Sequence, residues 1–87
     1  MRLVDAHGNQ VLQTLKAIEK ALCHTMVVTA SEGADSITLM EQYTNGDLIH
    51  VVRDKITGET RFENPDEAYM RFRFLVEADF QVCLPFL

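Results

Sequence analysis

Glu41 and His50 are the two residues whose types could together support acid–base chemistry. The dipeptide Asn45-Gly46 favours a two-residue type I′ turn, because that turn needs a positive φ angle at both central positions. Such a turn places Glu41 directly opposite His50 on the neighbouring strand. A carboxylate can orient an imidazole and raise its basicity. No nucleophile or oxyanion donor accompanies the pair, so a structural cross-strand pair is the preferred interpretation.

The cysteines and histidines do not form a metal-binding pattern. Cys23 and His24 are adjacent, whereas His7, His50 and Cys83 lie far from them in the sequence. A zinc site takes about four ligands in paired spacings such as C-x2-C, and no such spacing occurs. The sequence also lacks a phosphate-binding loop motif. We therefore expect no metal, no cofactor and no enzymatic activity.

Length and composition indicate one small globular domain over residues 1–87. Hydrophobic residues make up 47% of the chain and charged residues 24%, with a formal net charge of -5. This acidic balance argues against a nucleic-acid partner, which needs a basic surface. The sequence shows no secretory signal and no apolar run of the ~20 residues that a membrane span requires. With two cysteines and no disulfide framework, we expect a cytoplasmic protein with reduced thiols that does not bind membranes.

The expected fold is α+β, with an N-terminal helix, an antiparallel meander of three to four strands, a C-terminal helix and an apolar tail. Residues 9–24 carry apolar side chains at helical spacing. The β-branched and alternating segments predict strands at residues 25–29, 36–44, 48–54 and 59–63. Residues 1–4 fit either a brief strand or a lead-in to the helix.

The Asn45-Gly46 turn also predicts the register of the two central strands. The expected partners are Thr44 with Asp47, Tyr43 with Leu48, Gln42 with Ile49, Glu41 with His50, Met40 with Val51, and Leu39 with Val52. Both faces of the sheet are then partly apolar, whereas a sheet with one wet face shows cleaner alternation. Three arrangements stay open: one helix on each face, both helices on one face, or a second subunit against the sheet.

Residues 64–80 form the best-defined helix of the sequence. Asn64 is a suitable N-cap, and Pro65 fits the first helical position, where its missing N–H is not needed. Charged residues four apart can pair as Glu67 with Arg71 and as Arg73 with Glu77. The side chains expected to face the core are Ala68, Tyr69, Phe72, Leu75, Val76 and Phe80.

The same helix carries a second apolar stripe, formed by Met70, Phe74 and Ala78, on the opposite side. A surface helix needs only one apolar face, so something should cover the second. Either the tail of residues 81–87 folds back over Met70 and Phe74, or the stripe with Arg71 at its rim is an interface. The tail is unusually apolar, and Pro85 suits an edge strand or an extended arm. Three tail side chains would share one side: Val82, Leu84 and Phe86.

These features favour a cytosolic protein-interaction domain without catalytic activity, which binds a protein partner or itself as a homodimer. The expected interface residues are Met70, Arg71, Phe74, Ala78, Val82, Leu84 and Phe86. In size, acidity and element order the chain resembles some anti-CRISPR inhibitors. That resemblance implies, as an alternative, a phage or mobile-element protein that blocks a host complex. A third hypothesis is a small ligand-binding or enzymatic domain that uses Glu41 and His50.

Overall fold

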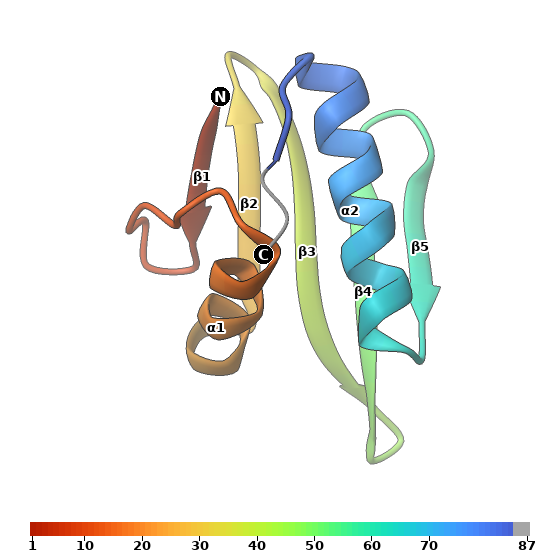
Figure 1. Ribbon diagram of the computed structural model, residues 1–87. Helices are drawn as coiled ribbons and strands as arrows, with labels where there is room; N and C mark the ends of the chain where they lie inside the picture. The colour runs from red at the N-terminus through yellow and green to blue at the C-terminus, as the bar shows by residue number, and fades with distance from the viewer. Residues whose placement is uncertain (85–87) are drawn as a thin grey trace.

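The computed structural model describes residues 1–84 as one antiparallel sheet with two helices. The strands are β1 (Arg2–Asp5), β2 (Val27–Glu32), β3 (Asp35–Thr44), β4 (Asp47–Asp54) and β5 (Gly58–Phe62), and the helices are α1 (Leu15–Thr25) and α2 (Pro65–Phe80). The five strands lie side by side in chain order (Figure 1). The α+β class and the meander are confirmed. The sheet gains a fifth strand, and the first helix follows β1 instead of opening the chain.

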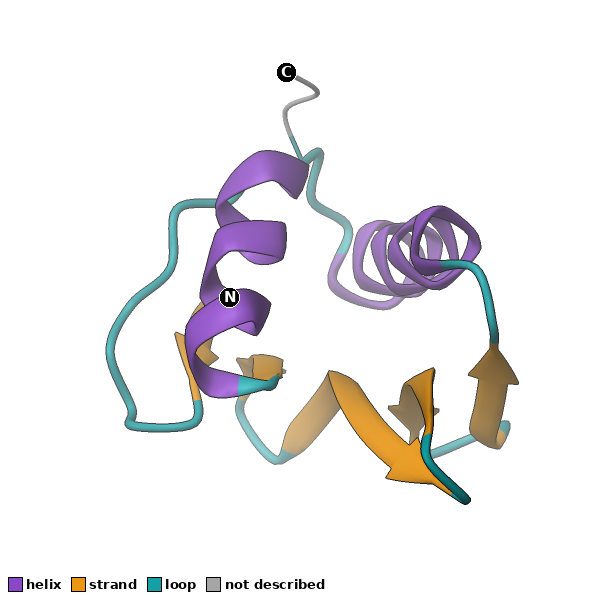
Figure 2. Cartoon of the chain, turned by 90° about the horizontal axis from the view of Figure 1, so that it is seen from below, coloured by secondary structure: helices purple, strands orange, loops and turns teal. Residues whose placement is uncertain are grey.

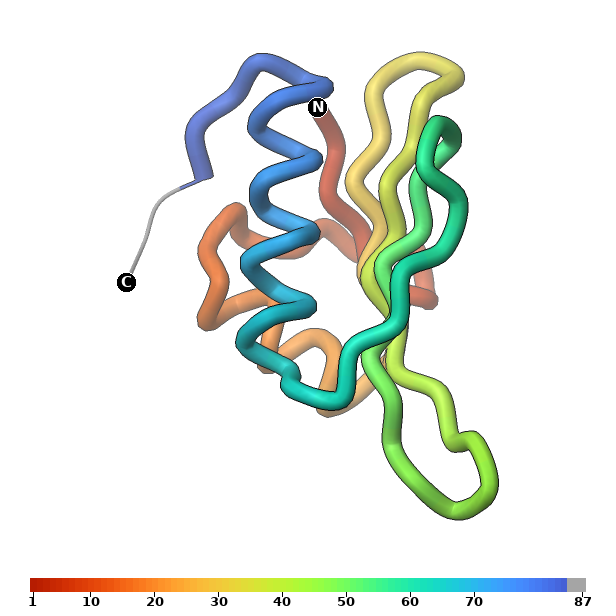
Figure 3. Tube along the Cα trace, turned by 90° about the vertical axis from the view of Figure 1, so that its right-hand side faces the viewer, coloured from red at the N-terminus to blue at the C-terminus, as the bar shows by residue number. Residues whose placement is uncertain are grey.

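The β3–β4 hairpin has the predicted turn and register. Asn45 and Gly46 have φ angles of 55° and 86°, as a type I′ turn requires. All six predicted pairs across the hairpin are present, including Glu41 with His50. The tip of the hairpin projects beyond the helices (Figure 3), which leaves Tyr43 70% exposed.

The prediction that a helix begins at residue 9 is wrong, because the chain there pairs with β1 instead. The Asp5 amide donates to the Asn9 carbonyl at 2.9 Å, and the Val11 amide donates to the Leu3 carbonyl at 2.8 Å. Gln10 forms an isolated antiparallel bridge with Val4. Residues 6–13 therefore run along the outer edge of β1, and we call them the N-terminal edge loop.

Helix α1 begins at Leu15 because Thr14 provides its cap. The Thr14 hydroxyl accepts a hydrogen bond from the Ala17 amide at 3.1 Å, which satisfies one free donor of the first turn. The helix ends at Thr25 and is followed by the C-cap Met26, which has a left-handed φ of 63° and donates its amide to the Leu22 carbonyl. This left-handed residue shifts the start of β2 from the predicted residue 25 to Val27.

Both helices cover the same face of the sheet (Figure 2), which is the second of the three arrangements considered from the sequence. Helix α1 packs over β1 and β2, and α2 packs over β3, β4 and β5. The core between sheet and helices includes Leu3, Ile18, Leu22, Val28, Leu39, Val52 and Phe72. Within residues 1–84, neither helix is long and apolar enough to cross a lipid bilayer.

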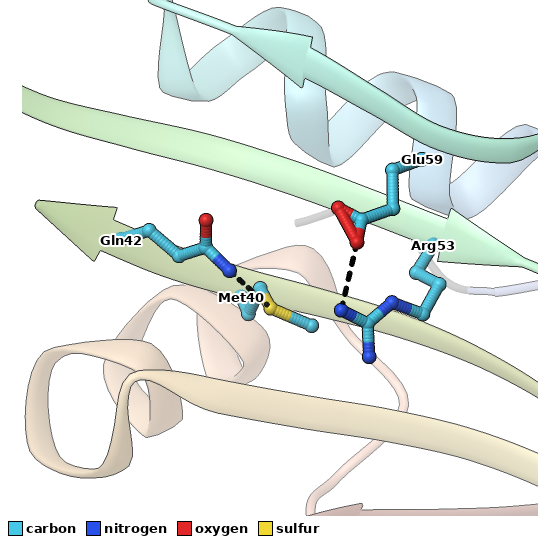
Figure 4. Close-up of polar contacts among 4 residues, drawn as sticks. All are labelled: Met40, Gln42, Arg53 and Glu59. Carbon is cyan, nitrogen blue, oxygen red and sulfur yellow. Dashed lines mark hydrogen bonds and ion pairs between the residues drawn. The ribbon is translucent and has the colours of Figure 1, made fainter. Parts of the chain in front are cut away.

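The other face of the sheet carries mixed side chains and no helix. Arg53 forms an ion pair with Glu59 at 2.8 Å, and the Gln42 amide lies 3.2 Å from the Met40 sulfur (Figure 4). Val51 is fully buried on this face, between its register partners Met40 and Arg61. Side chains of the sheet itself therefore shield the apolar centre of this face.

Candidate functional site

Helix α2 forms as its sequence predicts. The Asn64 side-chain oxygen accepts a hydrogen bond from the Asp66 amide at 2.9 Å, and Pro65 occupies the first helical position. All six side chains expected to face the core are buried. The predicted core face of the helix is confirmed, so its opposite side is the surface that needs an explanation.

That opposite side carries the apolar stripe of Met70, Phe74 and Ala78, which we call the outer stripe. Phe74 is 62% exposed, Met70 is 50% exposed, and Ala78 is also exposed. The Arg71 guanidinium lies over the Phe74 ring, 5.8 Å from its centroid, at a distance where a cation–π attraction operates. Arg71 is thus placed on Phe74 instead of in an ion pair with Glu67, and it forms a cationic rim beside the stripe.

The described part of the tail is held on the flank of α2 that faces α1 (Figures 1 and 2). Arg73 pairs with Glu77 at 3.0 Å, as the sequence predicts. The Leu84 amide donates to Glu77 at 3.1 Å, and Arg73 donates to the Leu84 carbonyl at 3.0 Å. The Leu84 side chain is fully buried and belongs to the core.

Leu84 therefore has to be removed from the expected interface. It is bound within its own chain, because one charged pair on α2 satisfies both of its backbone groups. Val82 is half-buried and packs against the same core. Phe86 lies outside the described residues. Residues 81–84 fold onto the domain without forming the expected edge strand, and they leave Met70 and Phe74 exposed.

The predicted Glu41–His50 pair lies on the helix-covered face of the sheet, beneath α2. His50 is only 5% exposed, and its ring meets that of Tyr69 edge-on, with centroids 6.3 Å apart. The His50 Nδ1 atom is buried and has no hydrogen-bond partner among the described residues. The two residues are brought together by register, but the imidazole lies in an apolar setting and not in an open cleft.

Burial raises the pKa of the Tyr69 hydroxyl to about 12, and carboxylates, with Glu19 first, add to the shift. The phenol beside His50 therefore stays neutral at physiological pH. A neutral phenol and a buried imidazole provide no activated nucleophile. This arrangement supports packing and not acid–base catalysis.

One other polar place could hold a ligand, and it has a structural explanation. A cavity of about 230 Å³ is lined by residues that include Asp35, Asp54 and Asp79. The Asp54 carboxylate accepts hydrogen bonds from the Ile56 and Thr57 amides at 2.6 and 3.0 Å, and also from the Thr57 hydroxyl. These bonds close the β4–β5 turn, so the carboxylate is already occupied.

The histidines and cysteines stay apart in the fold. Across residues 1–84, no group of three His, Cys, Asp or Glu side chains is arranged to hold a metal ion. Cys23 and Cys83 are both exposed free thiols. Among the residues considered from the sequence, only the outer stripe forms a coherent exposed surface.

The chain matches no known family model, no curated protein and no solved structure. Its function therefore has to be argued from the surface geometry alone.

Proposed function

We propose that this chain is a non-catalytic, cytosolic protein-interaction domain that self-associates through the outer stripe of α2. The observation that carries the proposal is the 62% exposure of Phe74 on a helix whose other face already covers the sheet. Large aromatic side chains dominate binding surfaces when a partner removes them from water.

The chemistry around Phe74 supports a protein partner. Met70 is flexible and polarisable, so it adapts to different surfaces. Ala78 is small and lets a second backbone approach closely. Arg71 keeps a charge at the edge of the stripe, and interfaces commonly combine an apolar centre with a polar rim. Burial of the part of Phe74 and Met70 that is still exposed would contribute about 1–2 kcal/mol each to association.

The test is the solution molar mass of the wild type and of Phe74→Glu, measured by light scattering over a concentration series. We expect a wild-type mass twice that of the chain, and a folded monomer for Phe74→Glu. Leu12→Glu is the matched control, because Leu12 is a 78% exposed apolar residue outside α2. A wild type that stays monomeric would disprove self-association. If Leu12→Glu also abolishes association, the effect of Phe74→Glu cannot be assigned to the outer stripe.

A further inference from the structure

The two edges of the sheet differ in whether the chain covers them. The edge at β1 is covered by the N-terminal edge loop, through the bridge between Val4 and Gln10 and the bonds from Asp5 and Val11. The edge at β5 carries no such segment in the described part of the chain (Figure 1). An open edge presents unpaired N–H and C=O groups that can bind another strand.

The register identifies the backbone groups that point outward from β5. In a two-residue hairpin, the residues next to the turn, Thr44 and Asp47, exchange both of their hydrogen bonds, and bonded and non-bonded pairs alternate from there. By this alternation, the backbone groups of Val52 point away from β3 and toward its partner Thr60 on β5. The outward groups of β5 are therefore those of Glu59 and Arg61.

We propose that the β5 edge binds the β5 edge of a second copy of this chain, antiparallel, with the two-fold axis at Thr60. The proposal rests on the proposed self-association and adds a strand–strand contact to the contact through the outer stripe. In this register Glu59 pairs with Arg61 of the second copy, and Arg61 pairs with the second copy's Glu59. Both are hydrogen-bonded pairs, so four backbone bonds join the copies into one continuous sheet.

Charge selects this register over the neighbouring ones that also align outward groups. An axis at Arg61 places Arg61 opposite Arg61 and Glu59 opposite Glu63, and an axis at Glu59 places Glu59 opposite Glu59. Like charges directly opposite destabilise a strand pair, while opposite charges stabilise it. Charged side chains on an edge usually prevent pairing, but here opposite charges meet within β5. An axis at Phe62 would also pair opposite charges, Arg61 with Glu63, but Glu63 lies beyond the end of β5.

The ion pairs within one chain leave Arg61 able to pair with the second copy. Glu59 already pairs with Arg53 at 2.8 Å on the open face of the sheet. Within residues 1–84, no ion pair involves Arg61, which is exposed. Dimerisation would place Glu59 between Arg53 of its own chain and Arg61 of the second copy, so each copy would supply a positive charge to the Glu59 of the other.

The pairing also brings the two α2 helices to the same side of the joined sheet. Arg73 and Glu77 hold the tail on one flank of α2, so at about 100° per residue Arg71 and Ala78 lie on the flank toward β5. With strands ~4.8 Å apart, the β4 strands of the two copies lie about 14 Å apart across the axis. The outer stripes would then border one shared furrow.

A charge-reversal experiment tests this edge. In E59R, residues 59 and 61 are both positive, and in R61E they are both negative. A homodimer of either variant therefore places like charges opposite each other at two positions. We expect the dimer dissociation constant of each to rise at least about tenfold, which is the effect of two reversed cross-strand pairs. An equimolar mixture of E59R and R61E should form a heterodimer with an affinity near that of the wild type. Arg2→Glu, on the covered β1 edge, is the matched control and should dimerise normally.

A cross-link tests the register independently, in a Cys23→Ser and Cys83→Ser background. Thr60→Cys should form an intermolecular disulfide on oxidation, because a non-hydrogen-bonded pair has Cα atoms about 4.5 Å apart, within the range that disulfides accept. Glu63→Cys should not, since its two copies would lie about 20 Å apart at ~3.4 Å per residue.

The outcomes separate the two proposals. Unchanged dimerisation in E59R and R61E, together with a monomeric Phe74→Glu, would overturn the β5 edge and leave the outer stripe as the interface. Cross-linking of Glu63→Cys but not of Thr60→Cys would overturn the register. A wild type that is monomeric throughout would overturn both self-association and this edge.

Discussion

Arg73 and Glu77 form an ion pair at 3.0 Å that also binds both backbone groups of Leu84. One turn of α2 thus fixes the path of the tail, and the buried Leu84 side chain belongs to the core. Loss of either charged partner should release the tail from the domain.

Glu77→Ala should lower the free energy of unfolding by about 1–3 kcal/mol, because it leaves the Leu84 amide without its acceptor and removes the ion pair with Arg73. Chemical denaturation measures the loss, and hydrogen exchange at the Leu84 amide should become faster. Glu67→Ala is the control, since Glu67 is exposed on the same helix. An equal loss in Glu67→Ala would contradict the role of the tail contact.

His50→Leu should change the free energy of unfolding by less than about 1 kcal/mol or increase it, because an apolar side chain removes a buried Nδ1 atom that has no hydrogen-bond partner within residues 1–84. His50→Ala should instead cost about 2–4 kcal/mol through the cavity that it leaves. Denaturant titrations of both variants check the contrast. If His50→Leu is as damaging as His50→Ala, the imidazole makes a polar contact that stabilises the fold.

Tyr69 should make the fold sensitive to alkaline pH. The unfolded tyrosine has a pKa of 10.0, and burial raises the pKa of Tyr69 to about 12. The folded state therefore keeps a proton that the unfolded state loses, so this contribution is complete below pH 10 and is lost as pH rises toward 12. A two-unit shift corresponds to at most about 3 kcal/mol, and solvent screening makes the loss of stability smaller than this.

The measurement is the tyrosinate absorbance of a Tyr43→Phe variant, in which Tyr69 is the only tyrosine. Its titration midpoint should lie well above 10. In Tyr69→Phe, the free energy of unfolding should fall less between pH 10 and 12 than it does in the wild type. An ordinary midpoint near 10 would mean that the hydroxyl reaches water.

Asp54 should contribute stability that acid removes. Hydrogen bonds from Thr57, with its side chain first, hold the pKa of Asp54 below its ordinary value of 3.8. The contribution is present above the unfolded pKa and is lost as pH falls through the lower folded pKa. Asp54→Asn should cost about 1–3 kcal/mol at neutral pH, since bonds to a charged acceptor are strong, and should weaken the acid dependence.

Thermal unfolding across acidic pH measures this effect, with Asp47→Asn as the exposed control at the other end of β4. The same acid dependence in Asp54→Asn and in the wild type would assign that dependence to other carboxylates.

Short-range signals predicted the parts of the fold that depend on a few adjacent residues. The positive φ angles of Asn45 and Gly46 determine the turn. The alternation of side chains along the flanking strands then allows only one register for the hairpin. Asn64 and Pro65 begin α2 where the cap requires it. The core face of α2 and the exposed outer stripe followed from helical periodicity, although the binding role of the stripe stays a prediction.

Long-range contacts account for the errors. Val11 and Leu12 extend the helical spacing of α1, but the backbone there pairs with β1, and Leu12 is 78% exposed. Leu84 has the alternation of an edge strand, yet side chains on α2 bind its backbone. Neither partner is visible in the local pattern, because both contacts form only when distant segments meet.

The N-terminal edge loop also limits how far any assembly through strand edges can grow. A sheet with two open edges can add copies without end and form fibrils, whereas a self-complementary contact made by a single edge closes after one addition. Because residues 6–13 already cover β1, edge pairing in this fold stops at two chains. The N-terminal edge loop, which does not contact the second copy, would thus protect the protein from open-ended aggregation.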